Sequence, residues 1–414
     1  MKNKVFSFIN ILGLTIGITV CAMIFLFIAN QFSFDKFHSQ GDRIYRLMRG
    51  FDNSKDRAPY LSAPYAPALL TDYPDEIKKA VRVMPANGLF AFDSITFNEK
   101  KLFIADADFF ELFSFPLLKG NPTTVLKNPT SVVLTEKTAR KYFGNDNPIG
   151  KILQLDKSKQ LTVTGIAKDL PVNSHLDFDL VIPLSNYINT EPFKAWENNN
   201  LFTYILLNEN KNAQKLENQL PSFMDRHMKA VSTNMGIHFD LALTPLKDVY
   251  LESHSAFDSA KHGDKKVIYI FLSIAILILV IACINFMNLS TIRAVDRSKE
   301  VGLRKVLGAQ RIQLMGQFIG ESILLTAISC LLAICLLQLL MPIYNQLLGY
   351  TLTVPWNWWP IYIFLLALIV IVGLLAGSYP ALYLSTFSPT QALKGKLRIG
   401  KGGTVFRHTL VVVQ

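Results

Sequence analysis

Hydrophobic residues gather in four long runs along the chain, separated by stretches of mixed polarity. Each run is long enough for the roughly 20 residues that a helix needs to cross a bilayer core of about 30 Å. The first run follows two lysines and could be a signal peptide, but it exceeds the usual apolar core of about 7–15 residues and no small-residue cleavage site follows it. We therefore expect transmembrane helices at 5–29, 267–289, 317–343 and 360–384.

The long stretch 31–266 has shorter patterns. Residues 211–229 place Leu216, Leu220, Phe223 and His227 on one helical face, and residues 62–83 are also interpreted as a helix. Alternating apolar residues predict strands at 131–134, 151–156 and 160–166, the last two joined by a hairpin turn at 157–159. Thr135 is a typical N-cap for a short helix ending at 143. These patterns predict a packed α+β domain between the first two spans.

Charge fixes the orientation of this arrangement. The 414 residues are 50% hydrophobic and 18% charged, with a net charge of +11, whereas soluble proteins carry roughly 25% charged residues. Residues 31–266 hold 29 basic and 28 acidic side chains, so nearly all of the excess flanks the apolar runs. Because basic loops stay in the cytoplasm, the loop 290–312 and the tail 385–414 are expected there. The domain at 31–266 and the short loop 344–359 are then periplasmic, and a nucleic-acid partner is excluded.

The sequence offers little catalytic chemistry. The loop from Gly144 to Lys151 has five residues between its glycines, where a phosphate-binding loop has four, and Ile152 stands where that loop needs Ser or Thr. An acidic cluster at 106–111 and the scattered histidines are interpreted as surface or core residues. All four cysteines lie in the apolar runs. We expect no catalytic residue, no metal and no cofactor, which makes an ectoenzyme the weakest alternative.

Three of the four spans contain two glycines one helical turn apart. Small residues at this spacing let helix backbones approach closely in lipid. The pattern favours a helix bundle or a dimer face over four independent anchors. The predicted helix-packing residues are Gly13, Gly17, Gly316, Gly320, Gly373 and Gly377.

The cytoplasmic loop carries the most informative pattern. Leu303, Val306 and Leu307 are spaced to form an apolar strip on a short helix, between charges of both signs. Gly302 would let another backbone approach, and Gly308 could end the helix in the left-handed conformation. A loop that only sets topology needs positive charge alone, so this pattern indicates a helix that docks on another protein.

The segment from Asp296 to Ala309 resembles the coupling segment of the MacB/FtsX-type ABC transporter permeases. Residues 110–120, 131–144 and 148–151 resemble the MacB-like periplasmic core domain, and residues 376–381 and 389–394 resemble the exit from the last span. The likeness covers almost the whole chain in the family's order of one span, a large domain and three spans. It implies an α-helical membrane protein with four transmembrane helices and a large α+β extracytoplasmic domain, in the bacterial inner membrane.

The resemblance also implies a function. Such permeases bind no ATP themselves, and a cytoplasmic ABC ATPase drives a conformational change that reaches the periplasmic domain and serves export or extraction of a substrate. Further partners would be a second permease half or a second copy, a periplasmic adaptor and an outer-membrane channel. An FtsX-like regulator of a periplasmic partner, such as a cell-wall hydrolase, is the alternative. The residues expected to contact the ATPase are Arg293, Asp296, Arg297, Lys299, Glu300, Gly302, Leu303, Arg304, Lys305, Gly308 and Ala309.

The two ends depart from the family pattern. Only four residues precede the first apolar run, where family members usually have an amphipathic helix, and a new apolar run begins at 406–414. Longer members repeat the whole unit. We therefore expect this chain to be the first half of a permease of about twice the length.

Overall fold

The computed structural model describes residues 2–52, 57–252, 258–296, 298–357 and 359–385. The chain divides into two units. One comprises Met1–Asn30 and Lys266–Gln414, and the other is the continuous segment Gln31–Lys265.

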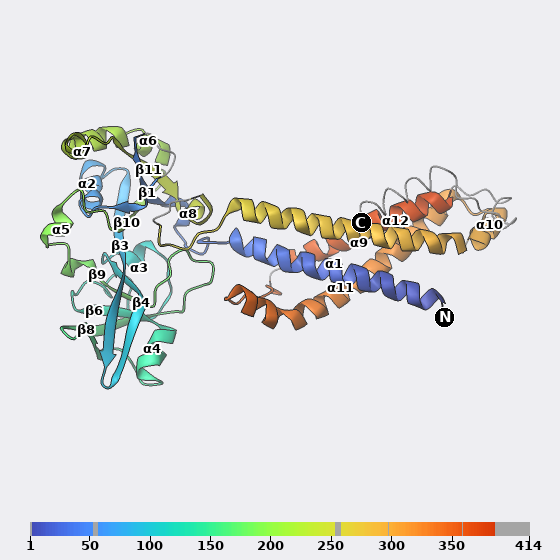
Figure 1. Cartoon of the computed structure of the whole chain (residues 1–414), viewed down its shortest axis with the longest axis horizontal. Helices are drawn as coiled ribbons and strands as arrows, with labels where there is room; N and C mark the ends of the chain where they lie inside the picture. The colour runs from blue at the N-terminus through green and yellow to red at the C-terminus, as the bar shows by residue number, and fades with distance from the viewer. Residues whose placement is uncertain (1, 53–56, 253–257, 297, 358, 386–414) are drawn as a thin grey trace. The chain divides into compact units, whose positions relative to one another are not determined.

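The first unit contains long apolar helices, as the hydrophobic runs predict. Helices α1 (Lys2–Gln31), α9 (Lys265–Asp296), α11 (Arg311–Leu348) and α12 (Pro360–Ser385) each contain a stretch apolar and long enough to cross a membrane (Figure 1). The short helix α10 (Ser298–Val306) lies between α9 and α11 in the chain. Both α9 and α11 extend beyond the predicted spans 267–289 and 317–343, because polar residues at their ends continue the helical backbone.

The four long helices pack through a small apolar core and through hydroxyl groups. Leu14 of α1, Phe286 of α9 and Val372 of α12 are at most 1% exposed and belong to one cluster. Thr15 and Thr19 of α1 each donate a hydrogen bond to a backbone carbonyl of α11, at 3.4 Å. Such bonds satisfy polar groups that lipid cannot solvate.

The glycine pairs have different surroundings. A Cβ atom at Gly17 would lie 2.9 Å from the Cβ of Ala282, and one at Gly377 would lie 2.7 Å from Ser322 Oγ. The pairs in α1 and α12 therefore sit at helix contacts within the chain. Gly316 and Gly320 of α11 have no atom within 4 Å of such a Cβ among the residues described. Among the residues that the structure describes, this third pair takes no part in helix packing.

The second unit is built on one mixed sheet. Its main path runs β11-β1-β10-β3-β4-β9-β6-β8-β5, with β2 paired to β10 and β7 paired to β3 and β8. The pairs β4–β9 and β6–β8 are parallel, and the others are antiparallel. The strands are β1 (Ile44–Phe51), β2 (Tyr60–Leu61), β3 (Ile77–Phe92), β4 (Ile95–Ala105), β5 (Leu117–Lys119), β6 (Ser131–Thr135), β7 (Ile152–Leu155), β8 (Lys159–Ala167), β9 (Leu180–Pro183), β10 (Leu201–Leu207) and β11 (Phe239–Pro245).

Helices cover the two ends of this sheet. Figure 1 shows α2 (Tyr65–Asp72), α6 (Ala213–Glu217) and α7 (Leu220–Met235) gathered near β1 and β11, and α4 (Glu136–Phe143) near the far end of the long β3–β4 hairpin. The remaining short helices are α3 (Phe109–Leu112), α5 (Glu191–Lys194) and α8 (Leu246–Glu252). The α+β character predicted from the sequence is confirmed.

The local predictions for this domain are mostly confirmed. Strands β6, β7 and β8 occupy the predicted stretches, and the turn between β7 and β8 places Asp156 and Lys157 at φ values of 48° and 59°. Left-handed residues are typical of a tight hairpin turn. The Thr135 side chain accepts a hydrogen bond from the Thr138 amide and caps α4. The predicted single helix over 211–229 is instead two helices: α6 buries Leu216, and α7 buries Leu220 and Phe223.

The prediction of one helix over 62–83 is wrong. Only Tyr65–Asp72 is helical, and the chain then enters β3 at Ile77. Strand β3 lies between β10 and β4 and buries Val81 and Val83 completely. Short apolar runs are compatible with a helix or with a strand. Here pairing with strands distant in the sequence makes the segment a strand.

Candidate functional site

Helix α10 ends in a well-formed turn. At its C-terminus Gly308 has φ +93°, the Gly308 amide donates to Lys305 O at 3.1 Å, and the Ala309 amide donates to Arg304 O at 3.0 Å. This pair of bonds is the Schellman arrangement that ends helices at a left-handed glycine. The helix end predicted at Gly308 is confirmed. Directly afterwards Gln310 and Gln313 form a reciprocal capping box that begins α11.

The two faces of α10 differ in burial. Val301 is 4% exposed and packs on Leu314 of α11, and Gly302 is also buried. The opposite face presents Leu303, Val306 and Leu307, of which Leu307 is 79% exposed. The predicted apolar strip is therefore present and uncovered in the structure.

Two basic residues of α10, Arg304 and Lys305, interact with residues of α11. The Arg304 guanidinium donates to Gln317 Oε1 at 2.6 Å, which ties α10 to α11. Burial, together with the charge of Arg311, lowers the pKa of Lys305.

The predicted coupling residues fall into two groups. Gly302, Leu303, Arg304, Lys305, Gly308 and Ala309 lie on α10 or in the turn that follows it. Arg297 and the side chains of Arg293, Asp296, Lys299 and Glu300 lie outside the described residues, as does the tail 386–414.

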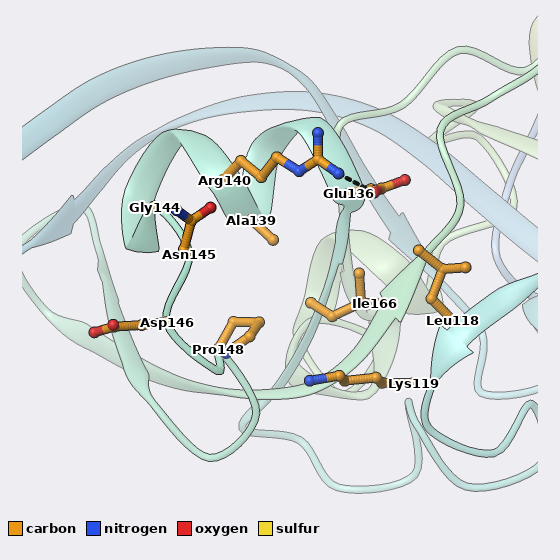
Figure 2. Close-up of a pocket in the computed structure, with 10 residues that line it drawn as sticks. All are labelled: Leu118, Lys119, Glu136, Ala139, Arg140, Gly144, Asn145, Asp146, Pro148 and Ile166. Carbon is orange, nitrogen blue, oxygen red and sulfur yellow. Dashed lines mark hydrogen bonds and ion pairs between the residues drawn. The ribbon is translucent and has the colours of Figure 1, made fainter.

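The periplasmic domain has a pocket of about 240 Å³ between β5 and α4. Figure 2 shows Ala139 and Arg140 of α4 on one side, and Leu118 and Ile166 of β5 and β8 on the other. None of the ten lining residues is a histidine, cysteine or serine. Arg140 is paired with Glu136 at 2.5 Å. Lys119 is hydrogen-bonded to Asn147 at 2.8 Å, and Asp146 is paired with Lys151 at 2.8 Å.

The loop from Gly144 to Lys151, whose glycine spacing differs from that of a phosphate-binding loop, also contributes to the lining of this pocket. Gly144 and Gly150 have φ values of 59° and 84°, and Lys151 is paired with Asp146 at 2.8 Å. The segment is a turn, as its spacing predicts.

The acidic side chains at 106–111 form ion pairs with two basic side chains of β3. Asp106 pairs with Arg82 at 2.8 Å, and Lys79 lies between Asp108 at 3.1 Å and Glu111 at 2.8 Å. These are structural ion pairs. Within the described residues no group of three His, Cys, Asp or Glu side chains could hold a metal ion.

Sequence reasoning missed one cluster. His38 and His175, which are 137 positions apart in the sequence, both lie near Asp35, and all three residues are buried. Their spacing along the chain gives no signal, because the fold alone brings them together.

The arrangement defines a class of protein. A large α+β domain follows the first of four apolar helices, and an exposed amphipathic helix lies between the second and third. These features are those of a polytopic permease with a large extramembrane domain.

A family model for the MacB-like periplasmic core domain matches residues 7–223, and one for the FtsX-like permease C-terminal region matches residues 272–389. The chain belongs to the MacB/FtsX-type permease family, and it is an inner-membrane protein whose large domain lies in the periplasm.

Named relatives are ATP-binding permeases. The chain is 24% identical over 265 residues to the macrolide export ATP-binding/permease protein MacB of Bdellovibrio bacteriovorus, covering 63% of this chain and 38% of that protein. It is also 24% identical over 296 residues to MacB of Haemophilus ducreyi, covering 69% of this chain and 39% of that protein. The chain thus spans less than two-fifths of the length of these relatives.

Two solved structures are similar to the periplasmic domain. One is a domain of a permease protein from Porphyromonas gingivalis, with 23% identity and a TM-score of 0.43 over 50% of this chain and 92% of that one. The other is the periplasmic region of MacB from Actinobacillus actinomycetemcomitans, with 18% identity and a TM-score of 0.38 over 50% of this chain and 91% of that one.

Proposed function

We propose that this chain is the permease subunit of an ABC transporter and transmits an ATP-driven conformational change from a cytoplasmic ATPase to its periplasmic domain. The observation that carries the proposal is the exposed apolar face of α10. Three aliphatic side chains at i, i+3 and i+4 are exposed on α10 and the first residue of the turn that ends it, in the loop that positive charge assigns to the cytoplasm. A rigid, uncovered apolar helix face favours docking in a groove of another protein.

On this proposal the chain itself hydrolyses nothing and holds no cofactor. ATP is bound by the partner subunit, and α10 with the turn at Gly308 contacts that subunit. The movement serves export or extraction of a substrate at the periplasmic face. The relatives' name, macrolide export protein, makes macrolides one substrate class to assay.

Further partners follow from the same proposal. The uncovered pair Gly316 and Gly320 on α11 leaves a surface that a second permease half or a second copy would cover. A periplasmic adaptor and an outer-membrane channel would complete an export route.

The test compares two leucines with nearly equal exposure. Leu307 of α10 is 79% exposed, and Leu347, near the other end of α11, is 81% exposed. Burying one leucine at an interface is worth about 1.5–3 kcal/mol, so Leu307→Ser should weaken ATPase binding at least about tenfold. Leu347→Ser should leave it unchanged.

The assay is affinity purification of the full-length native polypeptide in a gentle detergent, with mass spectrometry and ATP hydrolysis measured on the eluate. We expect an ABC ATPase to co-purify with the wild type and with Leu347→Ser, and to be lost with Leu307→Ser. Equal recovery of the ATPase with both variants would show that α10 is not the docking element. Absence of any ATPase from the wild-type eluate would contradict the proposed function itself.

A further inference from the structure

The two connections between the periplasmic domain and the membrane helices are bound to the same loop of the domain. After α1, the Asp35 amide donates to Asn173 O at 2.9 Å, and Asn173 Nδ2 donates to Ser33 O at 3.0 Å. Before α9, the Lys261 amide donates to His175 O at 3.3 Å, and the Lys261 ammonium lies 3.0 Å from Asp177. The loop 171–177 therefore holds both connections.

A continuous series of buried polar side chains also joins them. Asp35, in the first connection, has a carboxylate oxygen 2.8 Å from His175 Nδ1 and accepts a hydrogen bond from the His175 amide at 3.1 Å. His175 Nε2 shares a hydrogen bond of 2.8 Å with the Tyr204 hydroxyl on β10. The Tyr204 hydroxyl lies near the Arg46 guanidinium of β1, whose charge favours the ionised form of Tyr204, and Arg46 Nη2 pairs with Asp258 Oδ2, in the second connection, at 2.7 Å. We call these five residues the buried chain.

The buried chain runs through two neighbouring strands of the sheet, β1 and β10. Arg46 and Tyr204 are directly opposite each other in the β1–β10 ladder. The side chains of Asp35, His175, Arg46 and Asp258 are all fully buried, and Tyr204 has no exposed surface. Asp35 thus reaches β10 through His175, and Asp258 reaches the neighbouring β1 directly.

Electrostatics supports the link between Arg46 and Asp258. Burial alone would raise the pKa of Asp258, but hydrogen bonding to His262 and the charge of Arg46 outweigh it and lower that pKa to about 2. Removing one member leaves a buried charge without its partner, which is among the costliest changes in a protein interior. Asp35 also adopts φ +58°, a conformation that non-glycine residues seldom hold without support from their surroundings.

We propose that Asp35, His175, Tyr204, Arg46 and Asp258 are positioning residues that fasten both membrane connections to strands β1 and β10, so that a displacement of α1 or α9 moves the sheet as one body. This inference rests on the proposed function, because it names the route by which the movement enters the domain. A hinge at this point would absorb the displacement in the connections, whereas a rigid junction passes it on. The buried chain supplies that rigidity with hydrogen bonds and ion pairs from both connections.

The first experiment interrupts the chain at its centre. Tyr204→Phe removes one oxygen atom and keeps the ring. Tyr142→Phe is the matched control, because its hydroxyl is also buried and donates to a carboxylate, Glu99 Oε1, at 2.7 Å, but in a part of the domain outside the buried chain. Hydrogen exchange is measured by mass spectrometry on the full chain in lipid nanodiscs.

We expect exchange of the Asp35 and Lys261 amides to become at least about tenfold faster in Tyr204→Phe and to stay at the wild-type rate in Tyr142→Phe. Unchanged exchange in Tyr204→Phe, or equal acceleration in both variants, would overturn the inference. If Tyr204→Phe does not fold, His175→Gln is used, since its amide can still reach Tyr204 but loses the contact with Asp35. The same acceleration is then expected.

The second experiment separates the inference from the proposed function. With the co-purified ATPase, exchange is compared between the nucleotide-free and vanadate-trapped states. In the wild type we expect nucleotide-dependent changes in both connections and in β1 and β10, and in Tyr204→Phe only in the connections. If the wild-type domain shows no nucleotide dependence, the proposed function is wrong, while the first experiment still decides whether the buried chain fixes the connections. If Tyr204→Phe transmits the change to β1 and β10 as the wild type does, the inference is wrong and the proposed function stands.

Discussion

The glycine pairs allow a sharp test of the membrane helix packing, because identical sequence patterns have opposite surroundings. The perturbation is one methyl group, introduced as Gly373→Ala in α12 or as Gly320→Ala in α11. The new Cβ at position 373 would lie 2.9 Å from the Cα and 2.8 Å from the Cγ1 of Ile323 on α11. At position 320 it would meet no atom within 4 Å among the described residues.

The magnitude follows from these two environments. Overpacking costs about 1–3 kcal/mol, and a backbone Cα atom cannot rotate away as a flexible side-chain end can. Replacing glycine by alanine within a helix raises the stability by up to about 1 kcal/mol, and this gain applies at both positions. This common gain cancels in the comparison, so Gly373→Ala should be about 1–3 kcal/mol less stable than Gly320→Ala.

The assay is unfolding of each full-length variant in mixed micelles of increasing SDS fraction, with the protein monomeric, followed by circular dichroism. We expect Gly320→Ala at or slightly above the wild-type stability and Gly373→Ala below it. Two variants that agree within about 0.5 kcal/mol would refute the assigned contact between α11 and α12.

Three further changes probe other elements. Thr135→Ala should lower the stability of the periplasmic domain by about 1 kcal/mol in urea unfolding monitored by near-UV circular dichroism, because the hydroxyl that caps α4 is lost; an unchanged midpoint would contradict this. Burial lowers the pKa of His38 from 6.5 to about 4, so the unfolded chain takes up this proton first. Stability should therefore fall by up to about 3 kcal/mol as pH drops from 6.5 to 4, and a His38→Asn variant with the same pH dependence would be evidence against it. Gly308→Ala should strain the left-handed turn by about 1–2 kcal/mol and reduce ATPase co-purification, whereas unaltered recovery would show that the turn is not needed for docking.

The membrane helices were the most predictable part of the molecule, for a physical reason. A spanning segment must satisfy all its backbone hydrogen bonds internally and keep nearly all its side chains apolar, so composition and length alone reveal it. The short helix α10 was predictable because its signals are local, from the i, i+3, i+4 apolar positions to Gly308. Both features depend on residues close together in the sequence.

The sheet was only partly predictable. The hairpin β7–β8 is local, and the sequence predicts it. Strand β3 pairs with β10, which lies more than one hundred residues later, and residues 77–83 therefore form a strand where the local pattern favoured a helix. Of the three glycine pairs, the sequence could not distinguish the two that pack within the chain from the uncovered pair in α11, because that difference depends on which helix lies opposite.

The buried chain could not be predicted from the number of charged residues in the domain. The near balance of 29 basic and 28 acidic residues in 31–266 suggests a solvated surface, yet Asp35, Arg46 and Asp258 are fully buried. An apolar core would stabilise the fold as well as buried ion pairs do, or better. An ion pair, however, fixes geometry, since it is strong only at one distance and orientation. Placing such pairs where the chain enters and leaves the domain favours a defined junction over added stability, and the transmission that we propose through these two connections would require such a junction.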